Sequence, residues 1–205
     1  MNKVGEPGPR AQQKAATREA VLAAARDEFE AVGFEAANVR SIARRANVSA
    51  GTVLHHFGDK RELLHAALFD DLEVTLDRAL ARIGTKPLVK EASALGSAVF
   101  GYYQKRPALS RTLLKESLFA EGTWARAFVA QAQRVHQAVA QLARREVELG
   151  RLEASVSPDV VAAAWLSFFY FALIGWVQGA TPTPLAFTET LFAQHLEGLS
   201  PRRKP

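Results

Sequence analysis

Apolar residues recur every three to four positions along most of the chain, with polar residues between them. Near the N-terminus this spacing is set by Val21, Leu22, Ala25, Phe29 and Val32. Such a period is typical of an α-helix that buries one face. Gly33 follows at a position where glycine commonly ends a helix. The pattern therefore predicts a first helix from about residue 12 to residue 33.

Capping residues and helix breakers divide the rest of the chain into further helical segments. Asn38, Ser49 and Asp59 each precede a segment and can accept a hydrogen bond from a free N–H in its first turn. Proline near segment starts and glycine after segment ends mark other boundaries. The predicted helices cover residues 39–45, 50–57, 60–83, 87–105, 107–119, 123–149, 157–178 and 184–196. Because no sustained alternation predicts a strand, the predicted fold class is all-α, with about nine helices.

The composition is that of a soluble globular protein. The chain has 205 residues, of which 48% are apolar and 23% charged, and it has no cysteine. The lack of cysteine excludes disulfides, thiolate metal sites and cysteine nucleophiles. The net charge of +5 is mild and only permits a polyanionic partner. Since no apolar signal segment follows the polar N-terminus, we expect a cytoplasmic protein.

Residues 39–57 form the most informative segment. Two short helices meet at a tight turn at Asn47, and Ala43 and Ala46 are small enough for the helices to cross closely, which predicts a helix-turn-helix. Val53 and Phe57 supply the core side of the second helix. Residues 36–61 hold five basic residues and one acidic residue, so basic charge gathers where phosphates would lie.

The stretch NVRSIARRANVSAGTVLHHFGDKRELL resembles the DNA-binding signature of the TetR family of bacterial transcription regulators. The upstream run EFEAVGFEAANVRSIA is also similar, including the Gly33-Phe34 pair. The positions that agree at fixed spacing are Ile42, Ala43, Val48, Ser49, Gly51, Thr52, Phe57 and Lys60. The resemblance covers roughly the first third of the chain, and the rest is similar to the family only in helical layout and size.

The resemblance implies that the helix beginning near Ala50 enters the major groove of double-stranded DNA. The candidate DNA-binding residues at matching positions are Arg40, Ser49, Ala50, Thr52, Leu54, His55 and Lys60. Lys60 would clamp the phosphate backbone. Asn47 stands where the family usually has Gly. Leu54 stands where Tyr is common, so one phosphate-contacting hydroxyl is missing, unless Leu54 contacts a thymine methyl instead.

Residues 160–177 contain no charged residue and are long enough to cross a membrane. A helix that is apolar all round is also typical of one buried between its own core and a partner subunit. The Ser157-Pro158-Asp159 start signal favours a helix of a soluble protein. The resemblance implies a homodimer through the helices at about 157–178 and 184–196. We therefore expect this interface and no membrane.

The C-terminal helices are rich in aromatic residues, which suits a small-molecule pocket, although any one of these residues could equally belong to the core. The candidate ligand-binding residues are Phe100, Tyr103, Trp124, Phe128, Trp165, Phe168 and Phe169. Because no cluster of charged residues is evident among them, we expect an apolar or aromatic effector. The resemblance implies that its binding changes the spacing of the two DNA-reading heads.

The sequence contains few residue arrangements that are typical of a catalytic site. The five histidines are scattered, the one Glu-x-x-His (Glu62 to His65) has no second copy, and no Gly-rich phosphate loop or Gly-x-Ser-x-Gly motif occurs. We therefore expect no enzyme, no cofactor and no metal.

These observations divide the chain into a flexible N-terminal arm, a helix-turn-helix DNA-binding domain, a helical ligand-binding and dimerisation domain, and a basic tail, at residues 1–16, 17–62, 63–200 and 201–205. The arm residues Lys3, Arg10, Lys14 and Arg18 could contact DNA or belong to a solvated terminus. We expect a DNA-binding transcription regulator, a homodimeric repressor on a pseudo-palindromic operator that a ligand releases. A small-molecule sensor with an impaired DNA head and a membrane-associated helical protein remain as alternatives.

Overall fold

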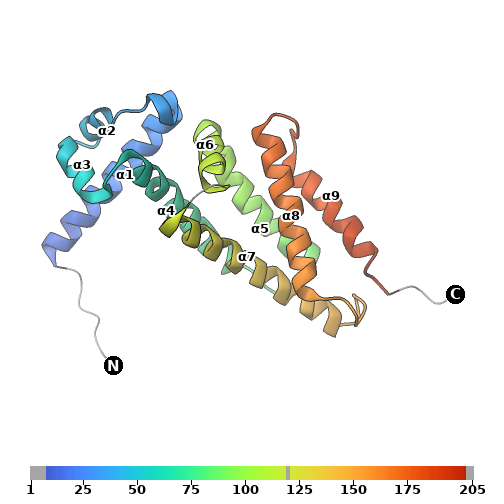
Figure 1. Ribbon diagram of the computed structural model, residues 1–205. Helices are drawn as coiled ribbons and strands as arrows, with labels where there is room; N and C mark the ends of the chain where they lie inside the picture. The colour runs from blue at the N-terminus through green and yellow to red at the C-terminus, as the bar shows by residue number, and fades with distance from the viewer. Residues whose placement is uncertain (1–7, 119–120, 202–205) are drawn as a thin grey trace.

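The computed structural model describes residues 8–118 and 121–201, and within these ranges it contains nine α-helices and no strand (Figure 1). The all-α prediction is confirmed. The helices are α1 Pro9–Ala36, α2 Val39–Arg45, α3 Ala50–Phe57, α4 Lys60–Leu80, α5 Leu88–Gln104, α6 Pro107–Leu118, α7 Gly122–Glu148, α8 Pro158–Val177 and α9 Pro184–Glu197. Most of the expected basic tail and the first seven residues of the expected arm lie outside the described residues.

Two groups of helices lie at opposite ends of the molecule. In Figure 1, α1, α2 and α3 form a head, α4 runs from this head into the body, and α8 and α9 lie on the side of the body farthest from the head. The buried residues of the head include Leu22, Phe29, Ile42 and Val53, which come from α1, α2 and α3. A rigid helix thus connects the helix-turn-helix to the larger body.

Short-range hydrogen bonds fix the head as the sequence indicates. Asn38 Oδ1 accepts from the Arg40 N–H at 2.8 Å, and Ser49 Oγ accepts from the Thr52 N–H at 3.0 Å. Each of these side chains satisfies a free donor in the first turn of a helix. Asn47, in the turn between α2 and α3, adopts a left-handed conformation with a φ of 56°. These caps and the turn orient α3 relative to α2.

The first helix is longer than expected at both ends. It begins at Pro9, so the expectation of a flexible arm is wrong for residues 9–16. Proline presets a helical φ at the first position, and the Ala, Gln and Lys residues that follow are good helix formers. At the other end Gly33, with a φ of 78° and a ψ of 164°, kinks the helix, which continues to Ala36. The structure also ends α4 at Leu80, where the sequence suggested residue 83.

Ion pairs hold α4 from both sides. On the head side, Arg26 of α1 donates to the Ala67 carbonyl at 3.1 Å and to Asp71 Oδ1 at 2.9 Å. On the body side, Arg134 of α7 forms ion pairs with Glu73 and Asp77. Because one helix is tied to both units, a shift of α4 relative to α7 would carry the head with it.

Among the described residues, α8 is the one helix long and apolar enough to cross a membrane. Only a third of its most apolar stretch is buried, and its inner side packs through Trp165, Phe169 and Leu173. A core helix of a soluble protein passes the same test of length and composition. Figure 1 shows α8 beside α9, with α7 on its other side. Its remaining exposed apolar side is therefore available to a partner.

Candidate functional sites

The helix α3 is anchored by one side and free on the other. Val53 and Phe57 are buried in the head core, whereas Ser49, Leu54 and His55 are exposed. Leu54 keeps 45% of its surface exposed although it is a large apolar residue. The outer face of α3 is therefore accessible to a partner outside this chain.

Two hydroxyl groups are held together at the start of α3. Ser49 Oγ and Thr52 Oγ1 lie 2.8 Å apart, and either can donate to the other. Ala50, between them in the sequence, is half-buried. Because Ser49 Oγ also accepts from the Thr52 N–H, it keeps either one lone pair or its proton for an external partner. This end of α3 therefore offers a fixed polar group rather than a mobile side chain.

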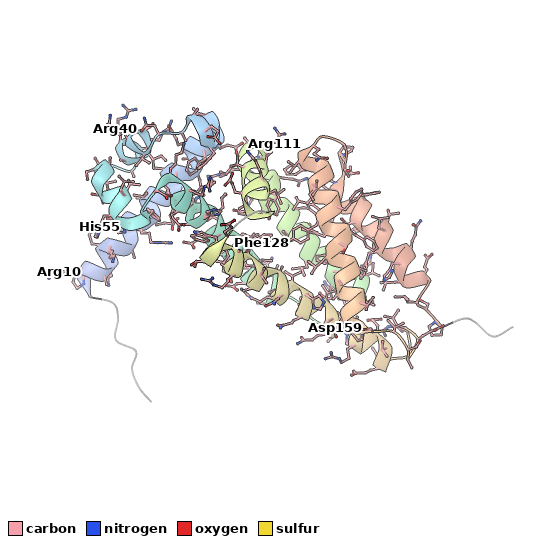
Figure 2. The ribbon with its side chains drawn as sticks, viewed as in Figure 1. Arg10, Arg40, His55, Arg111, Phe128 and Asp159 are labelled. Carbon is pink, nitrogen blue, oxygen red and sulfur yellow. The ribbon has the colours of Figure 1, made fainter. Side chains whose placement is uncertain are left out.

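Basic side chains surround this face. Figure 2 shows Arg40, His55 and Arg10 along the same edge of the head. Arg40 is exposed, whereas Arg45 forms an ion pair with the buried Glu28 at 3.0 Å. Arg40 is therefore the more available of these two α2 cations for a phosphate.

The N-terminal half of α1 adds further positive charge beside α3. The pKa of His56 is lowered first by partial burial and then by the positive charges of His55, Lys14 and Arg18. Arg18 also lies over the Phe57 ring, 5.6 Å from its centroid. The sequence left Lys14 and Arg18 as either DNA contacts or solvated residues. In the structure both belong to α1 and lie near α3.

Lys60 lies in a different environment from the other candidates. Its ammonium group donates to the carbonyl oxygens of Phe34, Glu35 and Ala37 at 2.8, 3.1 and 3.2 Å. An ammonium group has three N–H donors, and all three have partners here. Lys60 therefore closes the C-terminal end of α1, and a phosphate contact would require it to give up a carbonyl.

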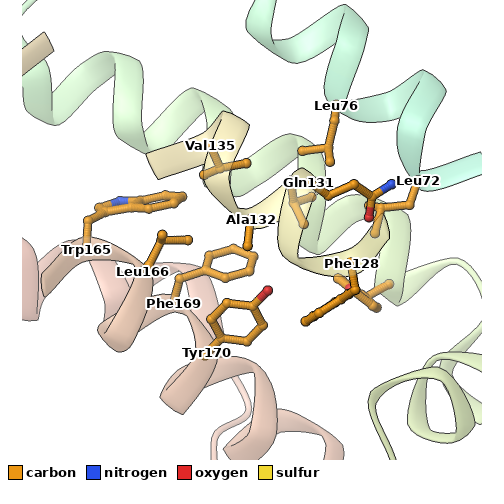
Figure 3. A pocket seen from close by; sticks show the side chains of 12 residues that line it. Leu72, Leu76, Phe128, Gln131, Ala132, Val135, Trp165, Leu166, Phe169 and Tyr170 are labelled. Atoms are coloured by element: carbon orange, nitrogen blue, oxygen red, sulfur yellow. The ribbon is translucent and has the colours of Figure 1, made fainter. Parts of the chain in front are cut away.

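The aromatic candidates divide into two groups. Tyr103, Phe128, Trp165 and Phe169 line a cavity of about 40 Å³ between α4, α5, α7 and α8 (Figure 3). The other three lie elsewhere. Phe100 packs behind the cavity, its ring 4.3 Å from that of Phe169, Trp124 lines a separate small cavity, and Phe168 lies against His195 of α9.

Sequence reasoning missed several residues of this cavity. Figure 3 shows Gln131 and Tyr170 beside Phe128, with Leu72 and Leu76 reaching the cavity from α4. Tyr170 belongs to the apolar run of α8, where its spacing from Trp165 was a usable signal. Gln131 carries no such signal, because similar Gln residues at 133 and 137 lie on the same helix but are exposed.

The Glu-x-x-His motif has a structural use. Glu62 Oε2 accepts from the Trp124 indole N–H at 2.6 Å, and the His65 ring stacks on the same indole with centroids 5.2 Å apart. Burial lowers the pKa of His65 more than the nearby carboxylates raise it. In the part of the chain that the structure describes, no group of three or more His, Cys, Asp or Glu residues could hold a metal ion.

Comparisons with known proteins agree with this geometry. A family model described as bacterial regulatory proteins, tetR family, matches residues 21–67, which span most of the head and the start of α4. The chain is 27% identical over 192 residues to the transcriptional regulator UidR of Escherichia coli K12, covering 89% of this chain and 90% of UidR. It is 28% identical to the transcriptional repressor KstR of Rhodococcus jostii, covering 83% and 78% of the two chains.

Solved structures share the fold. A TetR transcriptional regulator from Chloroflexus aurantiacus superimposes with a TM-score of 0.70 at 21% identity, covering 92% of this chain and 98% of that one. NalD of Pseudomonas aeruginosa, described as the secondary repressor of a multidrug efflux pump, superimposes with a TM-score of 0.66 at 22% identity, covering 94% and 100%. The chain thus carries a DNA-binding domain of the tetR family of bacterial regulatory proteins at residues 21–67, and it resembles regulators of that family in sequence and in fold over most of its length.

Proposed function

We propose that this chain is a sequence-specific DNA-binding transcriptional repressor that acts as a homodimer and is released by a small molecule. One observation carries the proposal. The helix α3 is fixed from within by Val53 and Phe57, and it directs the Ser49–Thr52 hydroxyl pair, Leu54 and His55 outward. A short helix with a fixed inner side and a polar outer side fits the major groove.

Each head residue has a distinct role in this proposal. Thr52, Leu54 and His55 face the base edges, with Leu54 against a thymine methyl. Arg40, Ser49 and the α1 residue Lys14 contact phosphates and fix the register of α3. Ala50 allows the start of α3 to approach the backbone closely. Lys60 acts mainly as a positioning residue, because its three donors bind the end of α1.

A second copy is needed because one short helix reads only a few base pairs. The exposed sides of α8 and α9 are suited to bind it. Val160 and Phe171 of α8 are 61% and 64% exposed, and the Phe171 ring lies 6.0 Å from that of Phe187 on α9. Large exposed apolar side chains on two adjacent helices are typical of a protein–protein interface. We assign the dimer interface to this face.

The names of two relatives support repression, and the aromatic cavity supports release by a small molecule. The relatives KstR and NalD are both described as repressors. The aromatic cavity adjoins α4, which is tied to the head, so an occupant can bias the head position. We assign no enzymatic activity and no cofactor, and we place the protein in the cytoplasm, where a bacterium holds its DNA.

Selection of DNA fragments from a random-sequence pool by the purified protein tests the proposal. We expect a palindromic site whose binding weakens steeply with salt. Recovery of unselected fragments alone, from protein freed of bound ligand by refolding, would contradict it and favour a sensor with an impaired head. A Leu54→Tyr variant in the same selection would show whether the missing hydroxyl is the reason.

A further inference from the structure

Three cavities of the body meet at one side chain. The central cavity of about 40 Å³ is large enough only for a few water molecules. An outer groove of about 350 Å³, lined also by Val129 and His136, opens to the surface. A third space of about 20 Å³ lies toward His65 and Trp124 of the head-proximal end. Phe128 lines all three, so its ring lies at the boundary of each.

The ring of Phe128 is not fully enclosed. The side chain is half-buried, and its aromatic neighbour across the cavity, Tyr170, lies 6.3 Å away in an edge-to-face arrangement. The outer groove and the central cavity share Phe128, Ala132, Leu166 and Tyr170. Phe128 is thus one of four side chains at the boundary between the groove and the cavity, and a change in its side-chain rotamer would widen the connection between them.

The central cavity contains one acceptor that no protein group satisfies. Gln131 is only 4% exposed, and its Nε2 donates to Glu73 Oε2 of α4 at 2.5 Å. A carboxylate only accepts, so the amide nitrogen must face Glu73 and the amide oxygen must face the other way. Figure 3 shows that oxygen turned toward Phe128. Gln131 Oε1 is buried without a hydrogen-bond donor, which is costly in a protein interior.

The remaining lining is uncharged. Among the described residues that line the central cavity, none carries a charge, and the side chains with polar groups are Gln131, Trp165, Tyr103 and Tyr170. Burial raises the pKa of Tyr170 to about 12 and that of Tyr103 well above its ordinary value, so both phenols stay neutral. A charged molecule would lose its hydration here without gaining a counter-charge.

We propose that the effector is an uncharged, flat, largely apolar molecule that enters from the outer groove by displacing the Phe128 ring and donates an O–H or N–H hydrogen bond to Gln131 Oε1. The inference rests on the proposed function, because it specifies the ligand of that regulator. Gln131 also connects the cavity to the head through α4. The same amide that binds the effector through its oxygen holds Glu73 of α4 through its nitrogen, so occupancy and α4 position share one side chain.

Three probes with one ring system test the ligand class on the full-length protein. These are 2-naphthol, 2-methoxynaphthalene and 2-naphthoate, with Kd measured by titration calorimetry. We expect 2-naphthol to bind at least tenfold more tightly than 2-methoxynaphthalene, which cannot donate, and 2-naphthoate to bind most weakly. Equal binding of the naphthol and its methyl ether would overturn the inference. Absence of 2-naphthol binding at 1 mM would overturn it as well.

Variants of Gln131 test whether 2-naphthol binds in the central cavity. In Gln131→Leu the preference for 2-naphthol over its methyl ether should disappear, whereas Gln137→Leu, the same change at an exposed site of α7, should keep it. Gln131→Met, closer in length, replaces the leucine variant if that protein does not fold. A preference that survives both Gln131 substitutions would place the probe elsewhere.

A variant of Phe128 tests whether its ring controls entry to the central cavity. Phe128→Ala should raise the association rate of 2-naphthol at least tenfold in stopped-flow tryptophan fluorescence. Leu149→Ala, at an exposed apolar residue just after α7, should leave it unchanged. An unaltered association rate in Phe128→Ala would show that the Phe128 ring does not control entry of the ligand. DNA selection is scored separately, so a protein that selects a palindrome but ignores all three probes contradicts this inference and not the proposed function.

Discussion

The head and the body of this molecule carry their chemistry on opposite sides of their helices. In the head, the apolar side of α3 is buried and the candidate DNA-binding residues Leu54 and His55 are exposed. In the body, the distinctive group is inside, where Gln131 is 4% exposed and its amide oxygen has no donor. A surface for a large rigid partner can thus be found from spacing alone. A site for a small molecule depends on which side chains the packing encloses.

The largest expected effect breaks the link between two copies. Phe171→Glu places a charge on the exposed apolar face of α8, which in a dimer would be buried without a partner. We expect a monomer in analytical ultracentrifugation and a loss of operator affinity of roughly a hundredfold or more, since the second half-site no longer contributes. Val74→Glu, a matched change at an exposed valine of α4, should leave both measurements unchanged. If the Phe171→Glu protein remains a dimer, the exposed face of α8 is not part of the dimer interface.

The next largest expected effect concerns how α3 discriminates between DNA bases. Thr52→Ala removes one hydroxyl of the pair at the start of α3. If it contacts a base edge, discrimination between the selected site and a single-base variant should fall by about 1–3 kcal/mol at one position. Thr112→Ala, in α6 of the body, serves as the control. Equal weakening on every sequence would mean that Thr52 only contacts the backbone.

A smaller effect concerns phosphate contacts. Arg40→Ala should weaken binding to all sequences by a similar factor and reduce the slope of log K against log salt by roughly 1. Arg111→Ala removes the same charge from the body, where Figure 2 places it far from His55. That control variant should keep the salt slope. An equal change of slope in both variants would show that Arg40 acts only through net charge.

The smallest expected effect on DNA comes from Lys60. Because its ammonium binds three carbonyl oxygens at the end of α1, Lys60→Met should lower the stability of the head by about 1–2 kcal/mol. Thermal unfolding should show a decrease in Tm of several degrees, on the order of 2–4 °C per kcal/mol. Lys105→Met, at an exposed lysine after α5, should leave Tm unchanged. Unchanged Tm with a strong loss of DNA binding would return Lys60 to the phosphate clamp.

The head was predictable because its determinants are local. Asn38, Asn47 and Ser49 act within three residues of themselves, so the sequence alone shows both turns and both caps. Lys60 was predicted as a phosphate contact because sequence cannot show that the end of α1 returns to it across 23 to 26 positions. The extension of α1 to Pro9 was readable from its proline and its helix formers.

The body was predictable as helices but not as a site. The Gln residues of α7 at 131, 133 and 137 look alike in sequence, and only the packing of α4 against α7 buries the first of them. The aromatic residues were similarly ambiguous. Phe128 and Trp165 reach the central cavity, whereas Phe168 turns toward α9. Which face of a buried helix lines a cavity depends on neighbours that are distant in the sequence.

The ratio of specific to non-specific DNA affinity tests the central claim most directly. The purified dimer would be titrated against its selected palindrome and a shuffled fragment of equal length, by fluorescence anisotropy at several salt concentrations. We expect the palindrome to bind on the order of a thousandfold or more tightly, with a steep salt slope on both fragments. Equal affinities for the two fragments in ligand-free protein would contradict the account, because the outer face of α3 would then read no sequence.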